Sequence, residues 1–228
     1  MSVSPVYRNF AVMNIKAALF DLDGVVFDTE PQYTRFWGGV FREYKPGSVG
    51  LELKIKGQTL VQIFDGYFEN PDERAAITKK LDAFERQMTF EYVDGFETFV
   101  SDLKRNGLKT CVVTSSNQAK MENVYVSRPE FRLYFDHILT SEDFSKSKPA
   151  PDCYLKGADV CGCQPSECVG FEDSYNGLRS VRGSGAFVVG LATTNPAGLI
   201  APLADWVIKD YRGLDTEKLR QEISLFRK

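Results

Sequence analysis

Short apolar runs alternate with longer amphipathic stretches along most of this chain. Runs of this kind are typical of strands that are buried on both faces of a parallel sheet. They cover residues 17–20, 111–113, 168–171 and 186–191. Ahead of the second run, apolar residues recur at helical spacing, at Phe96, Phe99, Val100 and Leu103. Gly107 follows where a helix end favours a left-handed residue. This alternation predicts a doubly wound (Rossmann-like) α/β core around a parallel sheet.

Residues 29–91 interrupt the alternation, because their pattern is helical only. An amphipathic stripe recurs at helical spacing in Tyr33, Phe36, Trp37, Val40, Phe41 and Tyr44. Thr29 and Gln32 have the spacing of a capping box, and Pro31 suits a first helical turn. A second stripe consists of Ile77, Leu81, Phe84 and Met88. We therefore predict a small helical domain at 29–91, inserted into an α/β core formed by 15–28 and 92–228, with an N-terminal extension at 1–14.

Three of the apolar runs end in a burst of polar residues. The first is followed by Asp-Leu-Asp-Gly at 21–24, the second by Thr-Ser-Ser-Asn at 114–117, and the third by Glu-Asp-Ser at 172–174. In an open parallel sheet, the ligand crevice lies outside the carboxyl ends of the strands. We expect the three bursts to converge there, although they are far apart in the sequence.

The convergence would bring the carboxylates of Asp21, Asp23 and Asp173 close together. Like charges at such distances repel one another and raise a pKa unless a cation compensates them. Carboxylates are hard oxygen ligands, and Mg²⁺ is commonly bound by one or two of them together with a substrate phosphate. The sequence therefore predicts a magnesium site among these carboxylates.

The same crevice would hold groups that suit a phosphate. The hydroxyls of Thr114 and Ser115 can donate to phosphate oxygens, and Lys148 lies in a Lys-Pro-Ala-Pro-Asp loop that restrains its ammonium. Together with the carboxylates, these are the components of phosphoryl transfer. Each motif alone also has an ordinary structural explanation, as a turn, a solvated loop or a helix cap. Their joint occurrence at strand ends favours a single site.

Composition narrows the range of functions. The 228 residues are 43% hydrophobic and 26% charged, as in a soluble globular protein, and the net charge of −3 argues against a nucleic-acid partner. A zinc site would lack ligands, because His137 is the only histidine and no cysteine pair has Cys-x-x-Cys spacing. We expect free thiols at Cys111, Cys153, Cys161, Cys163 and Cys168. Without an apolar leader or membrane span, we expect a cytoplasmic monomer with no membrane partner.

Four motifs in order resemble those of the haloacid dehalogenase superfamily of phosphohydrolases. They are Phe-Asp-Leu-Asp-Gly-Val at 20–25, Val-Thr-Ser at 113–115, Lys-Pro-Ala-Pro-Asp at 148–152 and Gly-Phe-Glu-Asp-Ser at 170–174. The resemblance extends from Ile15 to about Lys209. The helical insertion resembles the small cap of the β-phosphoglucomutase-like and phosphoglycolate phosphatase-like branch.

The resemblance implies roles for the matching residues. Asp21 would be the nucleophile that forms an aspartyl-phosphate, and Asp23 would protonate the leaving oxygen and then activate water. Mg²⁺ would be held by Asp21, Asp173 and the backbone carbonyl of Asp23. Glu172 would be a further ligand or a group that orients the ligands. The phosphoryl group would be bound by Thr114, Ser115 and Lys148.

In this superfamily the cap supplies the substrate specificity. The candidates for contact with the leaving group are Tyr33, Lys54, Lys56, Gln58 and Thr59. Dehalogenase and phosphonatase members lack an aspartate at the position of Asp23, so its presence favours phosphoryl transfer. The sequence thus predicts a Mg²⁺-dependent phosphatase acting on a small phosphorylated metabolite such as a sugar phosphate.

Two alternatives stay open. A sugar phosphomutase of the β-phosphoglucomutase type would share all four motifs, but it carries a histidine and an arginine in the cap where this chain has Tyr33 and Leu60. A tyrosine is no substitute for an imidazole at neutral pH, and a leucine cannot bind phosphate. A non-catalytic binding protein on the same fold would be expected to have lost one of the motif residues, and all of them are intact.

Overall fold

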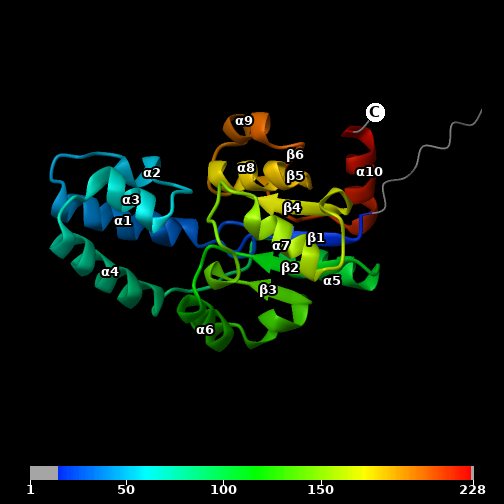
Figure 1. Ribbon diagram of the computed structural model, residues 1–228, viewed down its shortest axis with the longest axis horizontal. Helices are drawn as coiled ribbons and strands as arrows, with labels where there is room; N and C mark the ends of the chain where they lie inside the picture. Colours follow the sequence, from blue (N-terminus) through cyan, green and yellow to red (C-terminus); the bar gives the residue numbers. More distant parts are fainter. Residues whose placement is uncertain (1–14, 227–228) are drawn as a thin grey trace, which may run out of the picture.

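The computed structural model describes residues 15–226. Six strands form one parallel sheet in the order β3-β2-β1-β4-β5-β6 (Figure 1). They are β1 (Ala17–Phe20), β2 (Lys109–Val113), β3 (His137–Leu139), β4 (Cys168–Glu172), β5 (Phe187–Leu191) and β6 (Trp206–Ile208). The predicted α/β core with a parallel sheet is therefore confirmed. The sequence pattern missed β3 and β6, which have three residues each. The predicted extension at 1–14 lies outside the described residues.

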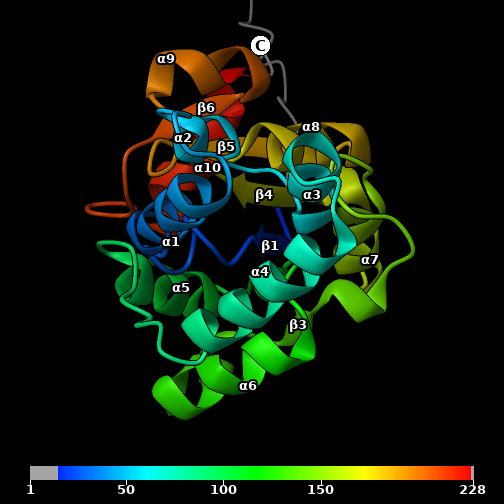
Figure 2. The same cartoon turned by 90° about the vertical axis from the view of Figure 1, so that its left-hand side faces the viewer.

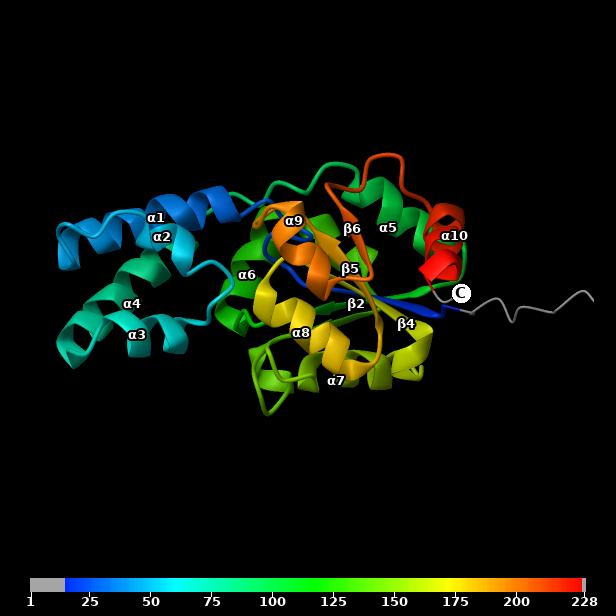
Figure 3. The same ribbon diagram turned by 90° about the horizontal axis from the view of Figure 1, so that it is seen from above.

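Helices cover both faces of the sheet (Figure 3). One face carries α5 (Phe96–Arg105), α6 (Gln118–Ser127) and α10 (Thr216–Phe226), and the other carries α7 (Asp152–Val160) and α8 (Tyr175–Ser184). Along β1, Ala18 and Phe20 belong to the first apolar cluster, whereas Ala17 and Leu19 belong to the second. Because strand side chains alternate between faces, a strand buried on both sides has to be apolar throughout.

The remaining elements are short. They are α9 (Ala197–Ile200) and 3₁₀ helices at Pro129–Tyr134, Ser141–Asp143, Pro165–Glu167 and Ala201–Leu203. The five cysteines are free thiols, as predicted. Within residues 15–226, no helix combines the length and the apolar character that crossing a membrane requires.

Four helices lie off the carboxyl-terminal edge of the sheet (Figure 1). They are α1 (Glu30–Tyr44), α2 (Leu51–Lys54), α3 (Leu60–Tyr67) and α4 (Pro71–Glu85). They enclose an apolar cluster of their own, made of Trp37, Val40, Phe41, Ile55, Ile63, Phe64, Phe68 and Ile77. Trp37, Val40, Phe41 and Ile77 of this cluster belong to the amphipathic stripes of the sequence. Three other stripe residues, Tyr33, Phe84 and Met88, pack against the apolar cluster of the sheet, so the stripes bury residues both within the helical segment and against the core.

The two segments that connect these helices to the core run side by side. Phe27 and Tyr92 form an antiparallel bridge. It is flanked by two backbone hydrogen bonds, of 2.9 Å from Asp28 N to the Glu91 carbonyl and 2.9 Å from Val93 N to the Val26 carbonyl. The chain thus leaves and re-enters the core at one place, next to the end of β1.

The predicted capping box at Thr29 and Gln32 is wrong. The Thr29 side chain is fully buried and its hydroxyl donates to Asp23 Oδ1 at 2.7 Å, so it does not cap α1. A hydrogen bond to a carboxylate is stronger than one to a neutral group, which explains the choice of partner. The Gln32 amide instead pairs with the backbone of Thr89. The capping box of this region is at Thr59 and Gln62 in α3.

Candidate active site

The cavity of interest lies where the strand order diverges. β1 is flanked by β2 on one side and β4 on the other, so the connections after these strands run in opposite directions and leave a crevice. A cavity of about 710 Å³ opens there, between the strand ends and helices α1 to α4. Figure 2 looks onto those helices with the sheet behind them. All three polar bursts of the sequence contribute to its lining.

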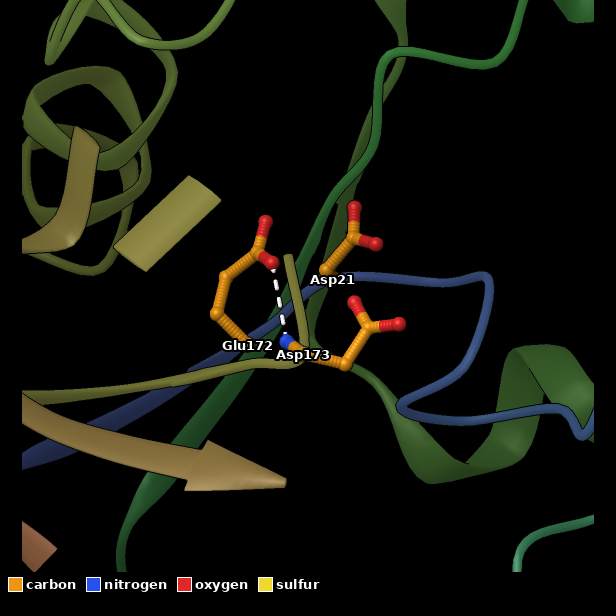
Figure 4. Close-up of side chains that lie close together, drawn as sticks. All are labelled: Asp21, Glu172 and Asp173. Carbon is orange, nitrogen blue, oxygen red and sulfur yellow. Dashed lines mark hydrogen bonds between the residues drawn. The ribbon is translucent and has the colours of Figure 1, made fainter. Parts of the chain in front are cut away.

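A cluster of three carboxylates forms the core end of the cavity. One oxygen each of Asp21, Glu172 and Asp173 lies within 4.8 Å of the others (Figure 4). Lys148 Nζ is 2.6 Å from Asp21 Oδ1 and 2.6 Å from Glu172 Oε1. Burial lowers the pKa of Lys148, but these two carboxylates raise it above its usual value. The lysine is therefore held as a cation beside the cluster.

The cluster carries more negative charge than Lys148 compensates. Burial raises the pKa of Asp21 to about 7, although the Lys148 ammonium opposes this shift. Burial and the Glu172 charge likewise raise the pKa of Asp173 well above its usual value. Asp173 accepts a hydrogen bond from the Thr194 hydroxyl, and among residues 15–226 no lysine or arginine forms a salt bridge with it. Hard oxygen donors in excess of local positive charge fit a divalent cation.

Glu172 uses both carboxylate oxygens for hydrogen bonds. Its Oε2 accepts from the backbone N–H of Asp173 at 2.9 Å, and from the N–H and hydroxyl of Ser174 at 3.1 Å each. The absence of a side chain at Gly177 makes space for this carboxylate, because a Cβ there would lie 1.8 Å from the Glu172 carboxyl carbon. Glu172 is thus one of the three carboxylates that could hold a cation, and its Oε2 also fixes the loop of Asp173 and Ser174.

The Asp23 carboxylate is not one of these three, although it lies near enough for its charge to contribute to the raised pKa of Asp21. Its Oδ2 is 2.5 Å from Lys120 Nζ and 3.2 Å from the Ser116 hydroxyl. Burial raises the pKa of Asp23, but the Lys120 ammonium and the hydroxyl donors lower it below its usual value overall. The Asp23 carboxylate is therefore paired with the Lys120 ammonium and not with the carboxylates of the cluster.

Gly24 makes the turn after Asp23 possible. Its φ of +74° is in the left-handed region, and a Cβ would lie 2.1 Å from Asp173 Oδ2. Any other residue would combine backbone strain with a clash against the carboxylate cluster. The glycine of the Asp-Leu-Asp-Gly motif is thus required where the β1 and β4 segments meet.

The three expected phosphate-binding residues, Thr114, Ser115 and Lys148, line the same cavity as Asp21. Thr114 is buried, and its hydroxyl accepts a hydrogen bond from Ser116 N at 3.0 Å. Ser115 is exposed to the cavity. The fold thus brings together three residues that lie on two loops far apart in the sequence.

The expected specificity residues are on the opposite wall, with one exception. Tyr33, Lys56, Gln58 and Thr59 line the cavity. Lys54 is exposed on α2 and does not line it, which corrects that expectation. The Thr59 hydroxyl is already engaged, since it accepts from Gln62 N as the cap of α3. Lys56 Nζ lies 3.8 Å from a Glu30 oxygen and 3.4 Å from the Thr194 carbonyl.

From the sequence, no role in the site was assigned to several polar groups around the cavity, although Ser116 belongs to the second polar burst. They are Thr29, Glu30, Glu52, Glu85, Ser116, Lys120 and Thr194. Lys120 had a detectable signal, because it precedes the buried Val124 by four residues and therefore lies on the same face of a helix. A lysine on a buried face needs a charged partner. The others occupy loops or ordinary surface positions of helices, where no pattern distinguishes them.

Comparison with known proteins identifies the family. Residues 15–185 match the haloacid dehalogenase-like hydrolases. Validoxylamine A 7'-phosphate phosphatase of Streptomyces hygroscopicus subsp. limoneus is 29% identical over 203 residues, which are 86% of this chain and 93% of that protein. Fructose-1-phosphate phosphatase YqaB of Escherichia coli (strain K12) is 26% identical over 73% of this chain and 91% of that protein.

Solved structures agree with the fold. The crystal structure of a haloacid dehalogenase hydrolase from Entamoeba histolytica superposes with a TM-score of 0.80 at 22% identity, covering 92% of this chain and 99% of that one. The chain therefore belongs to the haloacid dehalogenase-like hydrolases and is a phosphatase of that family.

Proposed function

We propose that this phosphatase hydrolyses a small phosphorylated metabolite, such as a sugar phosphate, through an aspartyl-phosphate on Asp21 and with Mg²⁺ as cofactor. One observation carries the proposal. The Asp21 carboxylate lies in the cavity 2.6 Å from the Lys148 ammonium, within a cluster of carboxylates that has unmet negative charge. A carboxylate next to fixed positive charge can accept a phosphoryl group whose own negative charge is neutralised.

In the first half-reaction, an Asp21 oxygen attacks phosphorus and the bond between phosphorus and the ester oxygen breaks. Asp23 in its protonated form gives its proton to the departing oxygen, so the leaving group departs as an alcohol. Thr114, Ser115 and Lys148 bind the phosphoryl oxygens. The products of this step are the alcohol, phosphorylated Asp21 and the Asp23 carboxylate.

In the second half-reaction, water attacks phosphorus and the bond to Asp21 breaks. The Asp23 carboxylate takes one proton of the water, and hydrogen phosphate leaves. This restores the Asp21 carboxylate and returns to Asp23 the proton that the next turnover uses. The cycle therefore needs Asp23 in both protonation states.

The carboxylates of Asp21 and Asp173 and the backbone carbonyl of Asp23 would hold Mg²⁺. When bound, the ion supplies positive charge next to the phosphoryl oxygens. Lys148 adds a fixed positive charge beside Asp21, and Glu172 fixes both Lys148 and the loop that carries Asp173.

We further propose that residues 29–91 are a cap that closes over a core formed by 15–28 and 92–228. The separate apolar cluster of α1 to α4 and the paired connecting segments at Phe27 and Tyr92 support this division. The cavity between the two parts suits a small substrate, because a site of this volume is typical of small-molecule ligands. One of the two relatives is named as a fructose-1-phosphate phosphatase, which supports a sugar phosphate as the class of substrate.

The charge of the cap side of the cavity favours hydrolysis over phosphomutase activity. Its charged residues are Glu30, Glu52 and Glu85 with a single cation, Lys56, which is already close to Glu30. Among the described lining residues there is no arginine. A mutase has to bind a second phosphate on this side, and an acidic wall repels it. Tyr33 and Leu60, at the positions where the mutases carry histidine and arginine, agree with this argument.

Incubation with β-glucose 1-phosphate, Mg²⁺ and a trace of glucose 1,6-bisphosphate tests the choice between the two activities. We expect inorganic phosphate to be released faster than glucose 6-phosphate forms. Both products are followed in the same reaction, by a phosphate assay and by a dehydrogenase-coupled assay. Accumulation of glucose 6-phosphate ahead of inorganic phosphate would overturn the phosphatase assignment.

The acidic wall also predicts discrimination against doubly phosphorylated substrates. We expect kcat/KM for glucose 1,6-bisphosphate to be at least about fivefold below that for glucose 6-phosphate, because two like charges 4 Å apart cost about 1 kcal/mol even in water. Glu52→Gln should bring the two kcat/KM values closer together. Glu43→Gln, which changes an exposed carboxylate of α1 outside the cavity, is the matched control and should leave the ratio unchanged. Equal ratios in wild type and both variants would contradict a role for the wall charge.

A further inference from the structure

Lys120 is the most extensively partnered cation of the region around Asp23. It belongs to α6, and its side chain is only 4% exposed. Its ammonium lies 2.5 Å from Asp23 Oδ2 and 2.7 Å from the Tyr33 hydroxyl. The Tyr33 hydroxyl in turn donates to Glu85 Oε1 at 2.8 Å. These four side chains come from the loop after β1, from α1, from α4 and from α6, so they meet only in the folded chain.

Several contacts hold the lysine in place. Its backbone N–H donates to Asn117 Oδ1 at 2.9 Å, which fixes the first turn of α6. Its neighbours Met121 and Val124 are buried in the core. Its ammonium also lies 4.9 Å from the centroid of the Tyr33 ring. Burial of an ammonium costs free energy unless the charge is paired. The charge or the hydrogen bonds of Lys120 therefore have a purpose at this position.

The rest of the Asp23 environment restrains the same carboxylate. The Thr29 hydroxyl donates to Oδ1 at 2.7 Å, while the Ser116 hydroxyl donates to Oδ2 at 3.2 Å. Of these three donors, Lys120 is the one that adds a charge and the one that connects Asp23 to Tyr33 and Glu85. Both of these residues belong to the segment proposed as the cap. The position of the Asp23 carboxylate therefore depends on how α1 and α4 contact Lys120 of α6.

We propose that Lys120 is a positioning residue, which holds the Asp23 carboxylate in place for the second half-reaction and connects it to the cap through Tyr33 and Glu85. The inference rests on the proposed function, in which Asp23 takes a proton from the attacking water. In that step the water oxygen bonds to phosphorus, the bond from phosphorus to the Asp21 oxygen breaks, and the proton goes to Asp23. Lys120 supplies no atom to the reaction and acts by holding the Asp23 side chain in position through the contact of its ammonium with Oδ2.

Lys120→Met tests the proposal, because it keeps an unbranched side chain as far as Cε and removes the ammonium. The substrate is p-nitrophenyl phosphate with Mg²⁺, whose leaving group departs without needing a proton. We expect kcat to fall by about tenfold or more, whereas kcat/KM, which reports only the first half-reaction, changes by less than about threefold. The steady-state fraction of phosphorylated enzyme, measured by intact mass after acid quenching, should rise.

The controls separate this role from a purely structural one. Lys156→Met removes an exposed lysine of α7 and should change none of the three quantities. Lys120→Arg keeps the charge and should recover part of kcat. A structural defect would lower kcat and kcat/KM together without accumulating phosphoenzyme, and that result would overturn the proposal. So would an unchanged kcat in Lys120→Met.

A second variant keeps the proposal testable if Lys120→Met does not fold. Tyr33→Phe removes the hydroxyl that joins Lys120 to Glu85, and we expect a smaller rise in phosphoenzyme together with a lower kcat. No rise in this variant would overturn the connection to the cap and, with it, the proposal. Failure of the proposed function looks different, since wild-type enzyme would then form no phosphoenzyme at all.

Discussion

Asp21→Asn is expected to lower kcat by about 10⁴-fold or more, which corresponds to roughly 5.5 kcal/mol of transition-state stabilisation. An amide is a poor nucleophile and cannot give an aspartyl-phosphate, and it is a weaker ligand for a cation than a carboxylate is. The fold should survive, because the Asp21 side chain faces the cavity and its burial already disfavours the charged form. Release of p-nitrophenol or inorganic phosphate measures the loss, and thermal unfolding checks the fold.

Asp159→Asn is the matched control for this variant. Asp159 is an exposed residue of α7 that pairs with Lys156 and does not line the cavity, so its amide should have wild-type activity. Intact mass has to confirm that the introduced asparagine has not deamidated back to aspartate. Turnover of Asp21→Asn within tenfold of wild type would rule out Asp21 as the nucleophile.

Removal of divalent cations is expected to abolish turnover, by at least about a hundredfold, and Mg²⁺ should restore it. The physical reason is the excess charge of the Asp21, Glu172 and Asp173 cluster, which Lys148 alone does not neutralise and to which a phosphate would add. Ca²⁺ should restore activity poorly, because its larger and looser coordination suits an in-line displacement less well. Phosphate release after exhaustive chelation and after readdition of each ion measures the effect.

Asp173→Asn sharpens the metal test. Removal of one carboxylate of the cluster should raise the Mg²⁺ concentration required for half-maximal activity by about tenfold or more. Asp159→Asn again serves as the control and should leave that concentration unchanged. Full activity of the chelated wild-type enzyme would refute the metal site, irrespective of the behaviour of either variant.

Much of the architecture was predictable because it follows from the spacing of apolar residues along the chain. β1, β2, β4 and β5 are apolar on both faces, and α1, α4 and α5 carry stripes at helical spacing. The convergence of the three polar bursts follows from parallel strand direction alone. β3 and β6 were missed because strands of three residues are too short to show a period. The predicted capping box at Thr29 does not form, because the Thr29 hydroxyl donates to the Asp23 carboxylate outside the helix.

Tertiary structure alone decided which partner each functional side chain has. Asp21 and Asp23 are two residues apart, yet one joins the carboxylate cluster with Lys148 and the other pairs with Lys120, 97 positions away in the sequence. Glu172 pairs with Lys148, 24 positions away, in addition to its local hydrogen bonds with Ser174. Periodicity reports which face of an element is buried, but the partner of a buried charge depends on where other elements bring compensating groups. The sequence therefore determined the type of site and its position in the fold, and the tertiary contacts of Lys148 and Lys120 determined how its charges are paired.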